Sequence, residues 1–182
     1  ADHPQVYGAA ADRPGIAYVD LDREVPAWLV TLVADAASSS DVVLVTPHWG
    51  PNMTTAPVPH VLTGSRALAA AGAGIIAGHS AHVFHGVTWD EGTCVLYDMG
   101  DFLDDYAVDP HLRNDLGVLW TVHLDGTTPV RVDAMPLRLD VCRTDVAAGS
   151  DAAWVEQRLR RACEGLPTVV DRVEQTLQCR AR

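Results

Sequence analysis

The sequence predicts an α/β fold built around a parallel sheet. Two short apolar runs rich in β-branched residues, 41–46 and 74–77, have the composition of strands that are buried on both faces. Between them, residues 61–72 have the alanine-rich composition of a helix. A strand, a helix and a second strand in this order form a βαβ unit, in which the strands are parallel and the crossover is right-handed.

The region before this unit contributes one strand and one helix. Residues 1–14 are polar and interrupted by proline, so we expect them to be irregular. Residues 15–21 alternate apolar and polar side chains, which predicts a strand. Apolar residues recur at helical spacing across 25–37, where Pro26 suits the first turn. The proline-rich residues 47–59 are expected to form a loop inside the βαβ unit.

Two β-hairpins are predicted after the βαβ unit. Their turns are marked by the sequences DEG at 90–92 and DG at 125–126. The strands expected on either side are 83–89 with 93–97, and 116–124 with 130–139.

The C-terminal part adds an amphipathic helix. Residues 151–164 have one apolar face, and Asp151 or Ser150 would cap the helix. Residues 168–179 suit either a final helix or two short strands. The cysteines are widely spaced, which indicates buried free thiols, or one disulfide among the last three: Cys94, Cys142, Cys163 and Cys179.

Length and composition are those of one globular domain. The chain has 182 residues, of which 48% are hydrophobic, and its net charge is −11. This acidity argues against nucleic acid as a partner, because nucleic-acid-binding proteins present a basic face. No apolar run is long enough for a transmembrane segment, and no signal peptide is visible. The expected compartment is the cytoplasm, or an extracytoplasmic one if an upstream segment carries a signal or anchor.

Histidines follow both strands of the βαβ unit directly. The run 41–46 leads into His48, and the run 74–77 leads into His79 and His82. Because parallel strands end at the same edge of a sheet, these imidazoles should converge there. Imidazole is the commonest metal ligand in proteins. The sequence therefore predicts a metal site formed by these three histidines.

An acidic segment follows the first hairpin. It has four carboxylates within eight residues: Asp98, Asp101, Asp104 and Asp105. These groups could bind hard cations or orient the histidines, and the alternative is a solvated acidic loop.

Four further residues are candidates for substrate binding. Asn52 could offer its amide to a substrate oxygen, and His85 would either line the rim or lie on the hairpin surface. Arg66 and Arg113 could bind an anionic substrate or form surface salt bridges.

At these residues the sequence resembles the CapA family of poly-γ-glutamate capsule biosynthesis proteins. The resemblance covers about residues 15–140. It runs through DVVLVTPHWG at 41–50, GHSAH at 78–82, YDMGDF at 97–102, DDYAVDP at 104–110 and RND at 113–115. It implies a calcineurin-like metallophosphoesterase fold, a β-sandwich flanked by helices, that binds two divalent transition-metal ions (Mn, Fe or Zn).

The resemblance also implies roles for individual residues. His48 and His79 would bind one ion, and His82 would bind the other. His48, His82 and Asp101 would be the catalytic residues, with the acidic segment around them. Many members of the family have Asn at the position of Asp101.

The family pattern includes ligands that this chain does not show. An Asp-x-His or its equivalent, a Gly-Asp and an Asn-His are expected in an N-terminal half, and none of them precedes Gly15. We therefore expect residues 1–182 to form a single, partial domain that resembles the C-terminal portion, with 141–182 as a helix-containing extension. The N-terminal half, as a separate chain, a cleaved segment or another segment of the protein, would complete the sheet and the metal site; the alternative is that the protein has lost this half.

The resulting functional hypothesis is a metal-dependent hydrolase of the metallophosphoesterase type. It would cleave a phosphoester, or a related acyl or amide bond, in an anionic or peptide-like substrate linked to poly-γ-glutamate or a related polymer. The alternatives are a non-catalytic CapA-like component for binding or assembly, and a tailoring enzyme for a small peptide-like metabolite.

Overall fold

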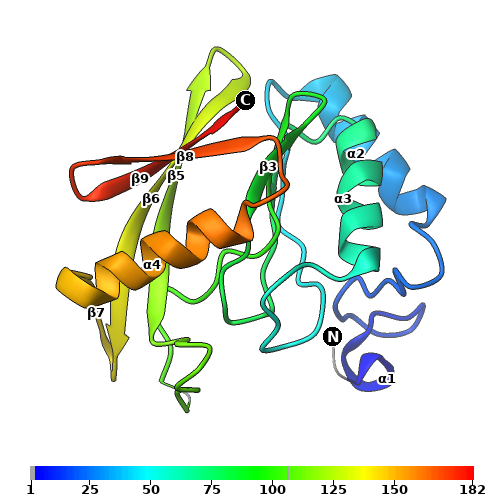
Figure 1. Ribbon diagram of the computed structural model, residues 1–182. Coiled ribbons are helices and arrows are strands. Elements are labelled where there is room, and N and C mark those ends of the chain that lie inside the picture. Colours follow the sequence, from blue (N-terminus) through cyan, green and yellow to red (C-terminus); the bar gives the residue numbers. More distant parts are fainter. Residues whose placement is uncertain (1–2, 106) are drawn as a thin grey trace.

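The computed structural model describes residues 3–105 and 107–182 and contains two β-sheets with helices packed on them (Figure 1). In chain order the elements are α1 (Pro4–Tyr7), α2 (Ala27–Ser39), β1 (Leu44–Val45), α3 (Pro59–Ala70), β2 (Ile75–Ala77), β3 (Val87–Asp90), β4 (Thr93–Leu96), β5 (Leu116–Asp125), β6 (Thr128–Asp140), β7 (Arg143–Val146), α4 (Gly149–Ala162), β8 (Thr168–Val173) and β9 (Thr176–Ala181). The first sheet has the order β1-β2-β4-β3, and the second has the order β5-β6-β9-β8 with β7 paired to β6. The predicted mixed α/β class is confirmed.

The predicted βαβ unit forms the edge of the first sheet. β1 and β2 are parallel, with Leu44 opposite Ile75, and α3 connects them. β2 is also parallel to β4, which pairs with β3 in the first predicted hairpin. Glu91 (φ 49°) and Gly92 (φ 92°) are the two central residues of its turn. Both have a positive φ, as a two-residue type I′ hairpin turn requires.

The expectation that residues 41–46 are buried on both faces is wrong. Only Leu44 and Val45 form a strand, and Leu44 is 57% exposed. The reason is the position of β1 at the edge of the sheet: among the described residues no further strand pairs with its outer side.

Two other local expectations are corrected. Residues 15–21 are not a strand but an irregular, mostly exposed segment, held at one point by a bridge between Gly8 and Ile16. Alternation of apolar and polar residues permits a strand, but a strand also needs a hydrogen-bonding partner along its length. Residues 3–14 contain the short helix α1, and residues 1 and 2 of the predicted lead-in lie outside the described residues.

The start of α4 also differs from expectation. The residue at its N-cap is Ala148, and no side-chain hydrogen bond caps the helix. The two predicted caps lie inside the helix instead. The Asp151 carboxylate pairs with Arg113 at 3.1 Å and Arg138 at 3.4 Å, so this ion pairing takes the place of a capping bond.

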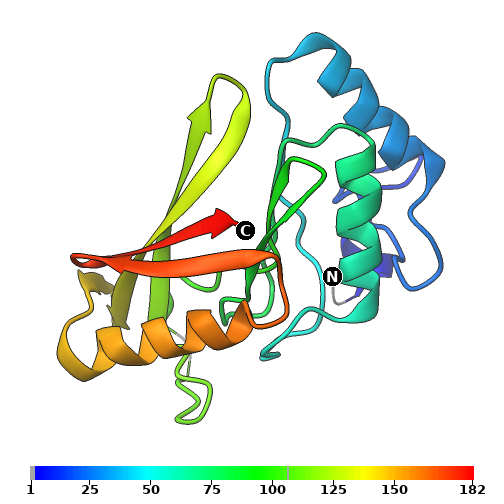
Figure 2. The same cartoon turned by 45° about the horizontal axis from the view of Figure 1, so that its top comes forward.

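The ambiguous C-terminal residues form strands. β8 and β9 pair with each other, and β9 lies between β8 and β6. The segment 141–182, expected as an extension, therefore supplies an inner strand of the second sheet (Figure 2). All four cysteines are free thiols; Cys142 is exposed and the others are buried.

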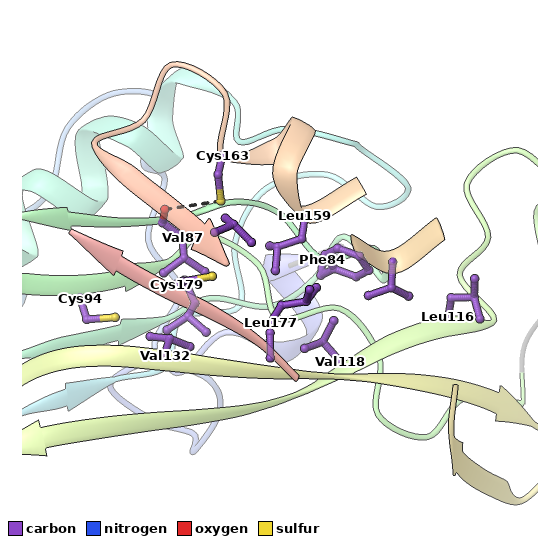
Figure 3. Close-up of a cluster of buried hydrophobic side chains, with 14 residues drawn as sticks. Phe84, Val87, Cys94, Leu116, Val118, Val132, Leu159, Cys163, Leu177 and Cys179 are labelled. Carbon is purple, nitrogen blue, oxygen red and sulfur yellow. Dashed lines mark hydrogen bonds between the residues drawn. The ribbon is translucent and has the colours of Figure 1, made fainter. Parts of the chain in front are cut away.

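Two apolar clusters hold the layers together. The larger joins the two sheets to α4, with Phe84, Val132 and Leu159 fully buried in it (Figure 3). The smaller lies between the first sheet and the helices α2 and α3, and it includes Trp49 and Ile76. Both faces of the first sheet are thus covered, which leaves the carboxyl ends of its parallel strands as the accessible rim. Within the described chain, no helix has the length and apolar character that crossing a membrane requires.

Candidate metal centre

His48 and His79 lie side by side where the parallel strands end. The pairing of β1 with β2 continues one step further, because the Trp49 N–H donates to the His79 carbonyl and the His79 N–H donates to the Pro47 carbonyl, each at 3.0 Å. The ladder brings the Nδ1 atoms of His48 and His79 to 3.2 Å from each other. The convergence expected from the sequence is therefore observed for this pair.

The geometry of this pair suits a transition-metal ion. Two nitrogens bound to one tetrahedral ion at about 2.0–2.1 Å lie about 3.3 Å apart, and the two Nδ1 atoms are 3.2 Å apart. Partial burial lowers the pKa of His48, and the neighbouring His79 ring lowers it further. A lowered pKa favours the neutral imidazole, which is the form that binds metals.

A buried indole supports the loop that follows β2. Trp49 Nε1 donates a hydrogen bond of 2.9 Å to the carbonyl of Tyr97 and passes directly over Gly78. A Cβ atom at Gly78 would lie 2.2 Å from Trp49 Nε1 and 2.3 Å from the Tyr97 oxygen. The absence of a side chain at Gly78 is thus required for this packing, immediately before the ligand candidate His79.

Asp98 anchors the same loop from beneath. It is 2% exposed, and its two oxygens accept the N–H groups of Ala81 (2.8 Å) and Gly100 (2.9 Å). Burial raises the pKa of Asp98, while these two hydrogen bonds lower it. The bond to Ala81 fixes the backbone between His79 and His82, so Asp98 holds the loop that carries both histidines.

His82 faces carboxylates rather than the His48–His79 pair. Its Nδ1 lies 3.0 Å from Asp101 Oδ1. One candidate ligand atom each from His82, Asp101 and Asp104 lie within 4.8 Å of one another. Burial raises the pKa of Asp101 to about 6, and contact with Asp104 adds to the rise. A charge on His82 also lowers the pKa of His48, and both residues lie on loops that follow the parallel strands β1 and β2.

The loop that follows β2 and carries His79 and His82 is conformationally strained. His82 has a φ of 59° and Ser80 has a φ of 141°, both in the region that favours glycine. Such conformations cost about 1–3 kcal/mol each and occur where the surroundings enforce them. Here the surroundings are the bonds of Asp98 and the packing over Gly78.

Of the predicted substrate-binding residues, Asn52 lies at the rim and His85 lies beneath it. Asn52 lines an open pocket together with His82, Asp104 and Asn114. His85 is 4% exposed, and its Nε2 donates to the Thr54 carbonyl at 2.9 Å, so it is not on the hairpin surface. Burial lowers the pKa of His85.

The structure does not bring the two predicted arginines to the histidines. Arg113 pairs with Asp115 at 2.7 Å and with Asp151 at 3.1 Å, and these partners raise its pKa. It joins a loop to α4, which is the salt-bridge alternative. Arg66 is exposed on α3, and none of the contacts described for the chain links it to His48 or His79.

One hydrogen-bonded pair near the rim was not predicted from the sequence. His60 Nδ1 lies 2.6 Å from Asp22 Oδ1, and both residues line a pocket with His48 and Tyr18. Asp22 follows the irregular segment 15–21, and His60 lies in the first turn of α3. No spacing or motif links the two residues, so only the tertiary structure reveals the pair.

The fold and the site define an α/β protein with a centre rich in histidine and carboxylate at the rim of a parallel strand pair. The sequence model of the family described as "Bacterial capsule synthesis protein PGA_cap" matches residues 2–106, more than half of the chain. The chain belongs to this family, and the resemblance to CapA is confirmed.

Three curated relatives show how the match extends. A probable polyglutamine synthesis accessory protein of Mycobacterium tuberculosis is 27% identical over 165 residues, which is 87% of this chain and 43% of the relative. The PGA biosynthesis protein CapA of Bacillus subtilis is 27% identical over 160 residues, 81% of this chain and 41% of the relative. The capsule biosynthesis protein CapA of Bacillus anthracis is 29% identical over 101 residues, which is 56% of this chain and 24% of the relative. The chain thus spans less than half the length of these relatives.

Proposed function

We propose that the protein is a metal-dependent hydrolase of the metallophosphoesterase type, linked to the metabolism of poly-γ-glutamate or of a related polymer or peptide. The family is linked to poly-γ-glutamate synthesis through the names of its members. The observation that carries the hydrolase proposal is the 3.2 Å approach of the His48 and His79 Nδ1 atoms at the ends of parallel strands. The adjacent group of His82 and Asp101 supports it.

The residues of the rim have different proposed roles. His48 and His79 would hold one divalent ion (Mn, Fe or Zn) and His82 a second. Bound ions of this kind activate a water molecule and stabilise charge during displacement at phosphorus. Asp98 keeps the two histidines of its loop in place, and Asn52 can donate a hydrogen bond to a substrate oxygen. The chain has a net charge of −11, so bound cations would also offset its repulsion of an anionic substrate.

The calcineurin-like fold is part of the proposal. Two sheets that face each other across one apolar core, with α2 and α3 on the outer face of the first sheet, support it. We propose that residues 1–182 are one partial domain of this fold, equivalent to its C-terminal portion.

A partner segment at the edge of the first sheet completes the proposed domain. An apolar groove runs along β1, and the exposed side chains of Tyr18 (43%), Trp28 (49%) and Leu44 (57%) lie in or beside it. An unpaired edge strand next to exposed apolar groups is a ready site for another strand. The proposed occupant is the N-terminal half of the domain, as another segment of the protein or a separate chain.

Metal analysis combined with a phosphodiesterase assay tests the hydrolase proposal. The full chain should contain bound transition metal and hydrolyse bis(p-nitrophenyl) phosphate when the N-terminal half is present. His79→Ala should reduce both metal content and turnover, whereas the exposed His111→Ala should change neither. A complete domain that binds metal but shows no turnover on phosphoester, acyl or amide substrates would refute hydrolysis.

A non-catalytic role in polymer assembly is the second candidate. It is favoured by one specific observation, that the relative in Mycobacterium tuberculosis is named an accessory protein. In this role the same rim would bind the polymer without cleaving it. Retention of poly-γ-glutamate by the protein without any loss of polymer length would distinguish it from the hydrolase.

A further inference from the structure

We propose that Cys163 and Cys179 are a redox-active pair of thiols, which a small disulfide such as oxidised glutathione converts into a disulfide bond that ties α4 to β9 and stabilises the chain. Cys163 follows α4 as its C-cap residue, and Cys179 lies on β9. The inference is independent of the hydrolase proposal, because it concerns the core of the second sheet and uses none of the residues at the rim.

The first argument is the position of the two side chains in one apolar cluster. Cys179 is fully buried on an inner strand, where Val132 on β6 and Val170 on β8 lie beside it. Cys163 is only 3% exposed. Both residues belong to the larger cluster, which packs α4 against the second sheet (Figure 3). The end of a helix and the middle of a strand thus place their sulfur atoms in the same core, although β8 separates them in the sequence.

The second argument is direct contact between the two thiols. Their sulfur atoms are within hydrogen-bonding range of each other. The Cys163 thiol also donates to the carbonyl oxygen of Val87, with the sulfur 3.8 Å from that oxygen. Cys179 is therefore free to donate to Cys163 while Cys163 donates to Val87. A disulfide bond is about 2.0 Å long, so the two sulfur atoms must come closer by rotation of one or both side chains.

The same contact makes the two thiols unequal. The hydrogen bond from Cys179 stabilises the Cys163 thiolate and lowers the pKa of Cys163, while it raises the pKa of Cys179. Burial raises the pKa of Cys94 to about 12. Cys142 lies in the turn between β6 and β7, where a contact with the Asp105 carboxylate raises its pKa. Since the thiolate is the nucleophile in disulfide exchange, Cys163 is the residue that attacks first.

The exchange with oxidised glutathione balances in two steps. The Cys163 thiolate attacks one sulfur of glutathione disulfide, which forms a mixed disulfide and releases one glutathione thiolate. The Cys179 thiolate then attacks the Cys163 sulfur and releases the second glutathione. The two cysteines together lose two electrons and two protons, and one glutathione disulfide becomes two molecules of glutathione.

Local opening gives the oxidant access to these buried sulfur atoms. In the order of the second sheet β8 is an outer strand among the described residues, and residues 163–167 connect α4 to it. Opening of this corner would expose both thiols while β5 and β6 remain paired. The disulfide would then hold the corner closed.

Peptide mapping of the full chain tests the pair. The folded chain is incubated with oxidised glutathione, its remaining thiols are blocked with iodoacetamide in urea, and it is digested with trypsin without reduction. Trypsin cleaves after arginine, so Cys163 falls in the peptide 162–172 and Cys179 in the peptide 173–180. Mass spectrometry should detect these two peptides joined by a disulfide, with neither of the other cysteine peptides joined to them.

Thermal unfolding measures the effect of the bond. Oxidation should raise the Tm by about 5–10 °C, because the disulfide closes a loop that the unfolded chain would otherwise leave free. Dithiothreitol should reverse this rise. Cys179→Ala should abolish it, whereas the matched control Cys94→Ala, at another fully buried cysteine, should retain it.

Each result decides the inference without reference to hydrolysis. Absence of the joined peptides from the oxidised parent would overturn the pair, whether or not the variants fold. A bond from Cys94 to Cys179 instead, or a bond that forms only in the urea-unfolded chain, would do the same. The joined peptides without a rise in Tm would overturn the stabilising tie between α4 and β9. Loss of turnover in the complete domain bears only on the hydrolase proposal.

Discussion

Replacing Gly78 with alanine tests whether the packing of Trp49 sets the position of the metal centre. The added methyl group would lie 2.2 Å from Trp49 Nε1 and 2.3 Å from the Tyr97 carbonyl oxygen, both far inside van der Waals contact. The oxygen belongs to the backbone of a buried residue, so the indole must move. Its 2.9 Å hydrogen bond to Tyr97 would then be lost, and the loop that carries His79 would shift.

The size of the effect follows from two contributions. A buried donor or acceptor left without a partner costs about 1–3 kcal/mol, and Trp49 is only 5% exposed. Forcing an extra methyl group into a packed site costs about 1–3 kcal/mol. We therefore expect Gly78→Ala to lower the free energy of unfolding by about 2–6 kcal/mol.

Urea unfolding followed by tryptophan fluorescence measures this change. With a denaturant slope of about 2–3 kcal/mol per molar urea, the midpoint should fall by about 1–3 M. The control is Gly126→Ala, which has open space around it but a φ of +59°. It adds only backbone strain, about 1–2 kcal/mol. If the two variants unfold at the same urea concentration, or Gly78→Ala retains the metal affinity of the parent, the packing argument is refuted.

Three further predictions concern the anchor, the core and the acidic group. Asp98→Asn should reduce metal affinity about tenfold, because the amide nitrogen would present a donor to the Ala81 or Gly100 N–H in place of an acceptor. Calorimetric metal titration measures this affinity, and an unchanged value would show that Asp98 does not hold the loop in place. Leu159→Ala should destabilise the chain by about 2–5 kcal/mol, since Leu159 is fully buried between α4 and the two sheets; a change below about 1 kcal/mol in urea unfolding would contradict this packing. The raised pKa of Asp101, about 6 against 3.8 in an unfolded chain, means that its contribution to stability is fully present below pH 3.8 and is lost as the pH rises through 6. Metal-free Asp101→Asn should therefore lose less stability than the parent between pH 5 and pH 7, and equal pH profiles would refute the shift.

Much of the secondary structure could be predicted from local pattern. The βαβ unit, both hairpins and α4 are where composition, periodicity and turn residues predict them. Local signals succeed there because each element makes most of its own hydrogen bonds or pairs with a neighbour in sequence. They fail at 15–21, where no strand among the described residues pairs along the segment, and at β1, where the sheet ends and Leu44 remains exposed.

The candidate site also has one part that the sequence predicts and other parts that it does not. The juxtaposition of His48 and His79 follows from sequence because it depends only on the parallel order of two strands. The buried position of His85, the pairing of Arg113 with Asp151, and the contact of His60 with Asp22 do not follow from it. These contacts join segments that are far apart along the chain, and no local pattern encodes which charged groups meet.

The amino-acid sequence by itself determined the α/β class and the family, and it brought two imidazoles to one rim, since strand order and a few motif residues suffice for these properties. Only the tertiary structure decided which acids face His82 and which residue holds the strained loop. The physical reason is that side-chain direction and burial depend on how layers pack, so Asp98 became a buried anchor while Asp101 and Asp104 came together at the pocket.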